Sequence, residues 1–179
     1  QLLISNKSEL CKFMDPDSGL TDKLVRDGVF TEVDAHRIRN KHDIEAKSST
    51  VVDIIFRKSD SSFDTFINAL CDTKQEHVAC FLGYQTTEIP LSEEHRKLLV
   101  TNQNELCKFI DPEGRLLTEI TSTGVFTTLD VNRVKANSTL DKMSLEILNI
   151  LARKPDITFQ KFINALSTTG QGHVRYILT

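Results

Sequence analysis

The sequence predicts an all-α protein built as two consecutive helical bundles, and two observations carry this prediction. One apolar motif occurs at residues 63–70 and again at 159–166, with Phe, Phe, Ile and Leu at positions i, i+3, i+4 and i+7. This spacing aligns four large side chains on one stripe of a helix. A shift of 96 positions also aligns residues 2–82 with 98–178 without a gap, giving about 33 identities.

The period of the repeat is too long for a stacked solenoid, so each copy should fold around its own core. We therefore expect a first domain at residues 1–84, a short linker at 85–91 and a second domain at 92–179. Hydrophobic content of 39% with only 4 Pro and 7 Gly is typical of a packed, helix-rich chain.

The charge and hydropathy of the chain argue against two classes of partner, nucleic acid and the membrane. A net charge of -3 and a pI near 6.0 argue against nucleic acid as a partner. No apolar run approaches the roughly 18 residues that span a bilayer, so no membrane association is expected. Four cysteines without close CxxC pairs indicate reduced, buried thiols and a cytoplasmic protein.

The first helix of the second copy should begin at Ser92, an N-cap residue followed by acidic residues. It should run to about Ile110, where Asp111 and Pro112 end it. In the first copy Gln1 aligns with Lys97, so we expect about five residues that would cap this helix to lie upstream.

A second helix is expected over about 18–27 and 115–123, closed by Gly28 and Gly124 in the left-handed conformation. A third should begin with Thr as N-cap and an acidic residue at N3, and it should end near Asn40 and Asn137. The residues at the N-cap and N3 positions are Thr31 and Asp34 in the first copy, and Thr127 and Asp130 in the second.

The fourth helix is predicted over about 45–58 and 140–154. Its last turn would carry the basic pairs Arg57-Lys58 and Arg153-Lys154, which suits the negative end of a helix dipole. The fifth helix carries the repeated apolar stripe, and a sixth should begin near residue 75 or 171. Each copy therefore contains six predicted helices.

These helices and their motifs resemble the caspase recruitment domain (CARD) of the death-fold superfamily. The resemblance rests on Gly-Val-Phe-Thr before the third helix, Phe-x-x-Phe-Ile-Asn-Ala-Leu in the fifth, and Thr-x-Gln-x-His-Val at the start of the sixth. Residues 169–173 match the last pattern more closely than 73–77. The resemblance implies two antiparallel six-helix bundles that act by binding other proteins.

By resemblance, the chain is a non-catalytic tandem module that recruits or assembles CARD-containing partners in apoptotic or innate-immune signalling. Its partners would be a caspase, adaptor or sensor, or further copies of itself, and it would form the N-terminal region of a larger protein. A decoy or inhibitor of CARD assembly is an alternative within the same class.

An alternative function of a different class is a pair of helical domains with a metal or enzymatic site made of Cys and His. The second copy of the repeat helps to test this alternative, because a shared site should recur there. Cys71, His77 and Cys80 could be imagined as ligands or nucleophile and base, yet Ser167 and Tyr176 replace the two cysteines in the repeat. Three loosely spaced ligands give weak support for zinc, and no Gln-Ala-Cys caspase signature is present. No catalytic residue, metal or cofactor is therefore predicted.

Charge differs between the copies and suggests where partners bind. Residues 8–83 hold 14 acidic and 10 basic side chains, whereas residues 104–179 hold 8 and 9. In CARDs, an acidic face on helices two and three commonly meets a basic face on helices one and four. The resemblance thus implies an acidic surface and a basic surface, although simple solvated faces remain an alternative. The candidates are Asp22, Asp27, Glu32 and Asp34 for the first, and Arg57, Lys58, Lys142, Arg153 and Lys154 for the second.

Overall fold

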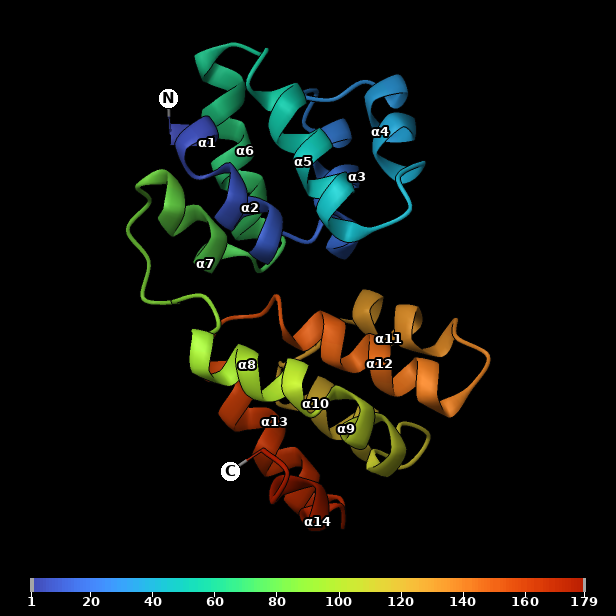
Figure 1. The fold of residues 1–179 in the computed structure, drawn as a ribbon. Helices are drawn as coiled ribbons and strands as arrows, with labels where there is room; N and C mark the ends of the chain where they lie inside the picture. Colours follow the sequence, from blue (N-terminus) through green and yellow to red (C-terminus); the bar gives the residue numbers. More distant parts are fainter. Residues whose placement is uncertain (1, 179) are drawn as a thin grey trace. The chain divides into compact units, whose positions relative to one another are not determined.

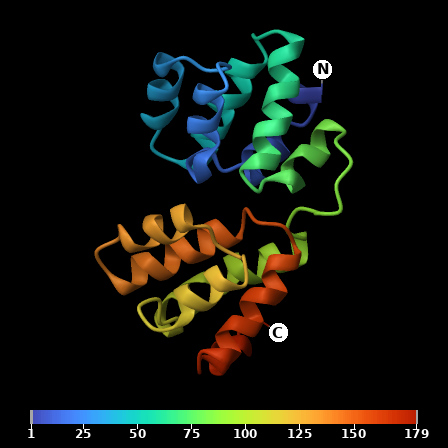
Figure 2. The ribbon, with the colours of Figure 1, turned by 180° about the vertical axis from the view of Figure 1, so that it is seen from behind.

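The computed structural model describes residues 2–178 of the chain, and Gln1 and Thr179 lie outside the described residues. It divides into two compact units, Gln1–Ile89 and Pro90–Thr179 (Figures 1 and 2). Residues 2–178 form an all-helical structure without a strand, as the sequence predicts. No helix in this range is long and apolar enough to cross a membrane.

Residues 2–89 of the first unit form seven α-helices and two short irregular helical turns. They are α1 Leu2–Ser5, α2 Lys7–Phe13, η1 Pro16–Leu20, α3 Thr21–Arg26, α4 Glu32–Arg39, α5 Ile44–Ile55, α6 Asp60–Asp72, α7 Glu76–Ala79 and η2 Cys80–Leu82. Within it α2 packs on α5, α4 on α5, and α3 on α6.

The second unit repeats this order. Its helices are α8 Glu93–Thr101, α9 Gln103–Phe109, α10 Leu116–Ser122, α11 Thr128–Lys135, α12 Leu140–Leu151, α13 Ile157–Thr168 and α14 Gly172–Arg175. Here α9 packs on α12, α11 on α12, and α10 on α13, which matches the pairs of the first unit.

The first helix of each unit is broken where a single helix was expected. The break falls at Asn6 between α1 and α2, and at the repeat position Asn102 between α8 and α9. Each Asn side chain donates to the carbonyl four residues earlier, Leu2 or Leu98, at 3.0 Å. Such side-chain bonds compete with the helical backbone pattern, which explains the break.

The predicted start of the third helix is confirmed in both units. Thr31 and Thr127 are N-caps that form full capping boxes with Asp34 and Asp130. The preceding glycines, Gly28 and Gly124, have φ of 75° and 74°, as expected for residues that close a helix in the left-handed region. A residue with a side chain would be strained there.

Three helix boundaries differ from the prediction. In the first unit α3 begins at Thr21 and not near Ser18, because Gly19 has φ of 90° and interrupts the helix. The fourth helix ends at Ile55 and at Leu151, so both basic pairs follow the helix and do not lie in its last turn.

The apolar stripe is fully covered only in the second unit. All four of its members in α13 are buried, from Phe159 to Leu166. In α6, Phe66 and Leu70 are buried, but Phe63 and Ile67 are half-buried. The prediction of a buried stripe is therefore correct for α13 and only half correct for α6.

A buried glutamine ties the two ends of each unit together. The side chain of Gln75 accepts from the backbone N–H of Asp15 at 2.8 Å and donates to its carbonyl at 3.0 Å. Gln171 makes the same two bonds to Asp111, at 2.8 and 3.1 Å. Each side chain thus satisfies both backbone groups of a residue that the helix end leaves unpaired.

Candidate functional site

The acidic candidates of the first unit lie on α3, on α4 and in the turn between them. Asp22 on α3 is exposed and accepts from Arg39 of α4. Asp27, which follows α3, lies 3.1 Å from Lys23 one helical turn earlier. Both carboxylates therefore already have a cation beside them within the unit.

The other two acidic candidates open α4. Glu32 lies 4.0 Å from Arg39, and Asp34 lies 3.4 Å from the Nζ of Lys58. The backbone N–H of Thr31 donates to Asp34, and this bond, together with Lys58, lowers the pKa of its carboxyl. Asp34 stabilises the start of the helix and also forms part of the surface.

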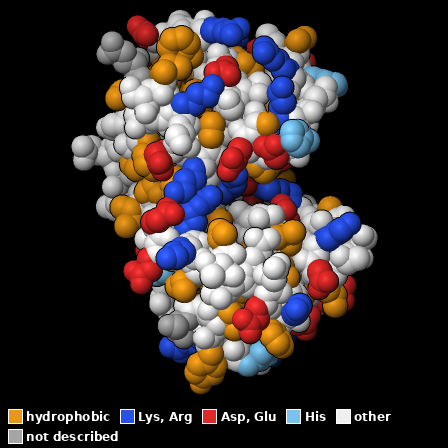
Figure 3. Space-filling view, in the orientation of Figure 1, with side chains coloured by type: hydrophobic (Ala, Val, Ile, Leu, Met, Phe, Trp, Pro, Cys, Tyr) orange, Lys and Arg blue, Asp and Glu red, His pale blue; other side chains and the backbone are white. Residues whose placement is uncertain are grey.

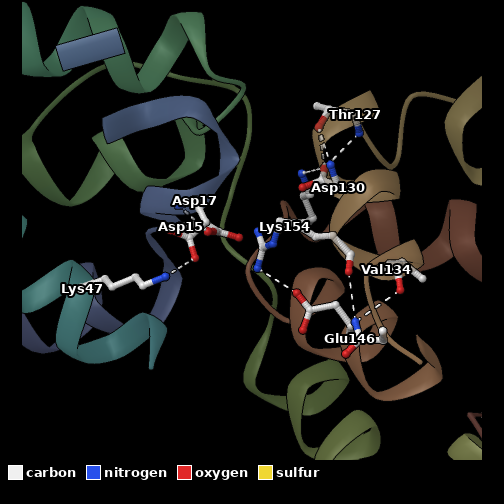
Figure 4. Close-up of polar contacts among 10 residues, drawn as sticks. Asp15, Asp17, Lys47, Thr127, Asp130, Val134, Glu146 and Lys154 are labelled. Carbon is white, nitrogen blue, oxygen red and sulfur yellow. Dashed lines mark hydrogen bonds and ion pairs between the residues drawn. The ribbon is translucent and has the colours of Figure 1, made fainter. Parts of the chain in front are cut away.

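These pairings make a mixed surface and not a uniformly acidic one. On the face of the first unit shown in Figure 3, basic and acidic side chains lie beside one another. A further pair, Lys47 and Asp17 at 2.6 Å, follows the same pattern (Figure 4). Exposed pairs, such as Arg39–Asp22, contribute only about 0 to 1 kcal/mol each, so a partner can exchange them at little cost.

The basic candidates of the first unit follow the end of α5. Arg57 is exposed and, within residues 2–178, no ion pair involves it. Lys58 next to it pairs with Asp34 across 24 positions of sequence. The structure therefore brings one acidic and one basic candidate together, although the sequence analysis assigned them to separate surfaces.

Lys154 occupies the position of Lys58 in the second unit, but its environment is different. It is only 8% exposed, and its Nζ lies 2.7 Å from the carboxylate of Asp130, which is 0% exposed (Figure 4). Burial opposes ionisation of Asp130, yet Lys154 and the Thr127 donors outweigh it and hold the pKa of that carboxyl below its usual value. Lys154 is therefore a packing residue of its unit and does not present its charge to a partner.

The remaining basic candidates differ in exposure. Arg153 is half-buried, and Lys142 is exposed in the first turn of α12. Lys142 borders a shallow groove of about 390 Å³ between α9 and α12. The groove is lined by Gln103, Asn104, Cys107, Lys108, Asp141, Lys142 and Leu145. The lining combines an apolar floor with two lysines, Lys108 and Lys142, and one carboxylate, Asp141.

Two cations at the surface of the first unit were missed by the sequence analysis. Lys23 bridges Asp27 and Asp72, at 3.1 and 2.9 Å. The four-residue spacing of Lys23 and Asp27 could have revealed the first of these contacts. Arg39 joins α3 to α4 across 17 positions, and no local sequence signal predicts that contact.

The four cysteines of the chain have similar environments. All four thiols are free and half-buried, not fully buried as predicted, and burial raises the pKa of each. A thiol with a raised pKa is a poor nucleophile at neutral pH. Among residues 2–178 no group of three His, Cys, Asp or Glu side chains could hold a metal ion.

A comparison with protein families found one match, and it lies in the first unit. Residues 1–85 match the model of the caspase recruitment domain, CARD. Comparison with curated proteins and with solved structures found no match in either case. One CARD is therefore found in this chain, over nearly the whole of the first unit.

Proposed function

We propose that the second unit is also a CARD, so that the chain acts as a tandem pair. The support for this proposal is a set of side-chain contacts that occurs inside the first unit and again, at equivalent positions, inside the second. Three contacts recur at equivalent positions of the two units. They are the hydrogen bonds of the buried glutamine, the capping box, and the ion pair between a lysine and the aspartate at N3. Each contact needs a specific side chain at a specific place in space. Chance similarity of apolar patterns does not produce such a set.

The first unit defines the class of function. A CARD is a non-catalytic domain that binds other CARD or death-fold proteins, and it implies a homotypic interaction module in apoptosis or inflammation signalling. We propose that the tandem pair recruits or assembles CARD-containing partners, including further copies of itself. Four free thiols fit a reducing, cytoplasmic setting.

The contact surfaces we propose follow from exposure and pairing. The acidic surface consists of Asp22, Asp27, Glu32 and Asp34 on the first unit. Each unit has its own basic surface, made of Arg57 and Lys58 on the first unit and of Lys142 and Arg153 on the second. Lys154 is left out because its ammonium group is buried against Asp130. A partner would replace the exposed pairs of the first unit by pairs across the interface.

Single contacts of this strength are too weak to hold a partner. Two units on one chain raise the effective concentration of the second contact once the first has formed, so avidity can exceed either affinity. Because the pairs are exposed, association should weaken as ionic strength rises, with a screening length of about 8 Å at 0.15 M salt.

The proposal is tested by charge reversal at surface positions. The binding probes are a fluorescently labelled copy of this chain and a set of purified CARDs from caspases, adaptors and sensors, measured by anisotropy at several salt concentrations. Arg57→Glu and Lys142→Glu should each weaken binding about five- to tenfold, as expected for the loss of a charge pair and its replacement by repulsion.

The matched controls are Lys41→Glu and Lys135→Glu. Both lysines are exposed, one in each unit, and both lie outside the proposed surfaces. They change the net charge equally and should leave binding within twofold of the parent chain. Failure of every probe to bind, or equal losses in the control and test variants, would refute the proposed surfaces.

A further inference from the structure

Basic side chains gather at the end of α4 in the first unit, in a stretch that belongs to neither proposed contact surface. In Figure 3, Lys or Arg side chains and His side chains lie side by side over the part of the first unit that contains α4. Within residues 36–42, five of the seven side chains are Lys, Arg or His, and all five are exposed. They are His36, Arg37, Arg39, Lys41 and His42. We call these five residues the α4 basic patch.

Two members of the patch already have a carboxylate beside them. The guanidinium of Arg39 binds Asp22, and Nε2 of His42 lies 2.9 Å from Asp43. These two side chains therefore contribute little to the attraction of a further anion. Their carboxylates also place negative charge next to the patch.

Arg37 and Lys41 are the cations of the patch that have no counter-charge. Among the residues that the structure describes, no ion pair involves either of them. Lys41 lies just past the end of α4, where its backbone N–H still donates to the carbonyl of Ile38 at 3.0 Å. It therefore follows Arg37 by about one turn, on the same side of the helix. A guanidinium and an ammonium group thus lie exposed beside each other.

His36 adds a donor to these two cations. Its Nδ1 lies 2.8 Å from the side-chain amide nitrogen of Asn40. An amide nitrogen can only donate, so Nδ1 accepts this bond and the neutral imidazole carries its proton on Nε2. Because His36 is exposed, the Nε2–H group can donate to a ligand. A set made of donors and cations alone selects an anion.

The second unit lacks this patch. At the equivalent positions, three of the five side chains are replaced by the uncharged Asn132, Asn137 and Ser138. Of the two that stay cationic, Arg133 is half-buried and lies 2.9 Å from Glu146, which leaves Lys135 as the exposed one. Cations near the end of a helix balance its dipole, but α11 ends with far fewer of them. The dipole of α4 therefore does not account for the whole patch.

We propose that the α4 basic patch binds a compact anion with several closely spaced phosphate groups, either free or as the headgroup of a membrane lipid. One phosphate group accepts from the guanidinium of Arg37 and the ammonium group of Lys41. A neighbouring phosphate group accepts from the Nε2–H of His36. Charge-assisted hydrogen bonds of this kind are about twice as strong as those between neutral groups.

The size and surroundings of the patch favour a compact anion over nucleic acid. Residues 36–41 span about 7 to 8 Å along the helix axis, at a rise of about 1.5 Å per residue. This length accommodates two or three phosphate groups, whereas proteins that bind DNA commonly contact about 6 to 10. A longer polyanion would also meet the carboxylates of Asp22 and Asp43 beside the patch.

Binding to the full chain tests the proposal with two probes. Sodium tripolyphosphate, followed by titration calorimetry, carries the phosphate chemistry in free form. Phosphatidylcholine vesicles with and without phosphatidylinositol bisphosphate, followed by co-sedimentation, present it as a lipid headgroup. Tripolyphosphate should bind at least tenfold more tightly than inorganic phosphate, and its affinity should fall as salt rises. Binding to the phosphoinositide vesicles as well would identify the lipid source, and no saturable binding to either probe overturns the proposal.

Charge reversal locates the bound anion. Arg37→Glu and Lys41→Glu should each weaken the binding of tripolyphosphate about tenfold, because repulsion replaces a charge-assisted bond. The matched control is Lys135→Glu, which makes the same change of charge at the exposed position of the second unit equivalent to Arg39. It should leave binding within twofold of the parent chain. An equal loss in the control would show that the anion responds only to net charge, which overturns the assignment.

His36 gives an independent readout through nitrogen NMR. Its spectrum should show a neutral ring protonated on Nε2, and the Nε2 resonance should move as tripolyphosphate is added. His36→Ala should weaken binding about threefold, the loss expected for one hydrogen bond. A resonance that stays in place at saturation would remove His36 from the site. Lys41→Glu should at the same time leave the binding of CARDs within twofold, so this proposal and the proposed contact surfaces can fail separately.

Discussion

Two ion pairs occupy the same repeat position, and their surroundings make them different. Asp34–Lys58 and Asp130–Lys154 have the same residues, the same 24-residue separation and the same capping role. The first pair is partly solvated at 3.4 Å, and the second is buried at 2.7 Å. Because the two residues of the pair are the same, the difference in their exposure must come from the residues around them. Identical residues at equivalent positions can therefore belong to the surface in one unit and to the core in the other.

The largest expected difference between the units follows from removing the lysine. Lys154→Met should destabilise the second unit by about 3 to 5 kcal/mol, because it leaves the buried carboxylate of Asp130 without its counter-charge. Lys58→Met should cost about 1 kcal/mol or less in the first unit. Urea denaturation followed by hydrogen exchange of each unit measures both values, and equal costs would contradict the comparison.

The contribution of the Asp130–Lys154 pair to stability should also depend on pH. The pKa of Asp130 is lowered in the folded state, so its contribution to stability is present above its ordinary value of 3.8 and is lost as pH falls below it. The effect should be smaller than that of Lys154→Met, because protonation removes the charge and leaves the Thr127 bonds possible.

Melting curves between pH 2 and 6 measure this dependence. The control is Asp130→Asn, which should flatten the pH dependence of the second unit below pH 4. Compared with this variant, the parent chain should lose stability more steeply as the pH falls. A curve that is the same with and without the Asp130 carboxyl would show that the pair does not couple to folding.

The buried glutamines provide a comparison of intermediate size. Gln75→Leu removes two bonds to Asp15, whose backbone is buried, and should cost about 2 kcal/mol, since buried polar groups left unpaired cost about 1 to 3 kcal/mol. Gln171→Leu should cost less, because Asp111 is exposed and water can replace the bonds. Denaturant midpoints of the two variants give the ranking, and the reverse order would show that solvent access does not set it.

The smallest expected effect concerns one backbone position. Lys74 has φ of 62°, and the equivalent residue Gly170 has φ of 83°. Lys74→Gly should stabilise the first unit by up to about 1 kcal/mol, because glycine adopts this conformation without the Cβ penalty. Gly170→Lys should destabilise the second unit by a similar amount. Thermal melts of the two single variants should shift in opposite directions.

Local features of the fold could be predicted from the sequence. The capping boxes at Thr31 and Thr127 and the glycines that precede them follow from short-range rules of helix termini, and all were found. The stripe of α13 followed from helical periodicity. These features depend on residues that lie within about two turns of one another.

The candidate surface could be predicted only in part, because pairing depends on contacts distant in sequence. Asp34 was assigned to one surface and Lys58 to another, yet they meet across 24 positions. The same is true of Lys154, which is buried against Asp130, a residue 24 positions earlier in the chain. Charge patterning identifies which residues are ionised, but it does not indicate which of them face water.

The glutamine bonds also set an order for folding during synthesis. Asp15 and Gln75, like Asp111 and Gln171, are 60 positions apart, so neither unit can close its polar framework until its last helix has left the ribosome. Because domains fold as units from the N-terminus, the first unit can close while most of the second is still being made. The growing chain then carries one finished unit. The second copy, which shares 33 of 81 positions with the first, emerges when the hydrogen bonds between Asp15 and Gln75 have already formed. Early closure of residues 15 and 75 thus protects two similar sequences from exchanging helices with each other.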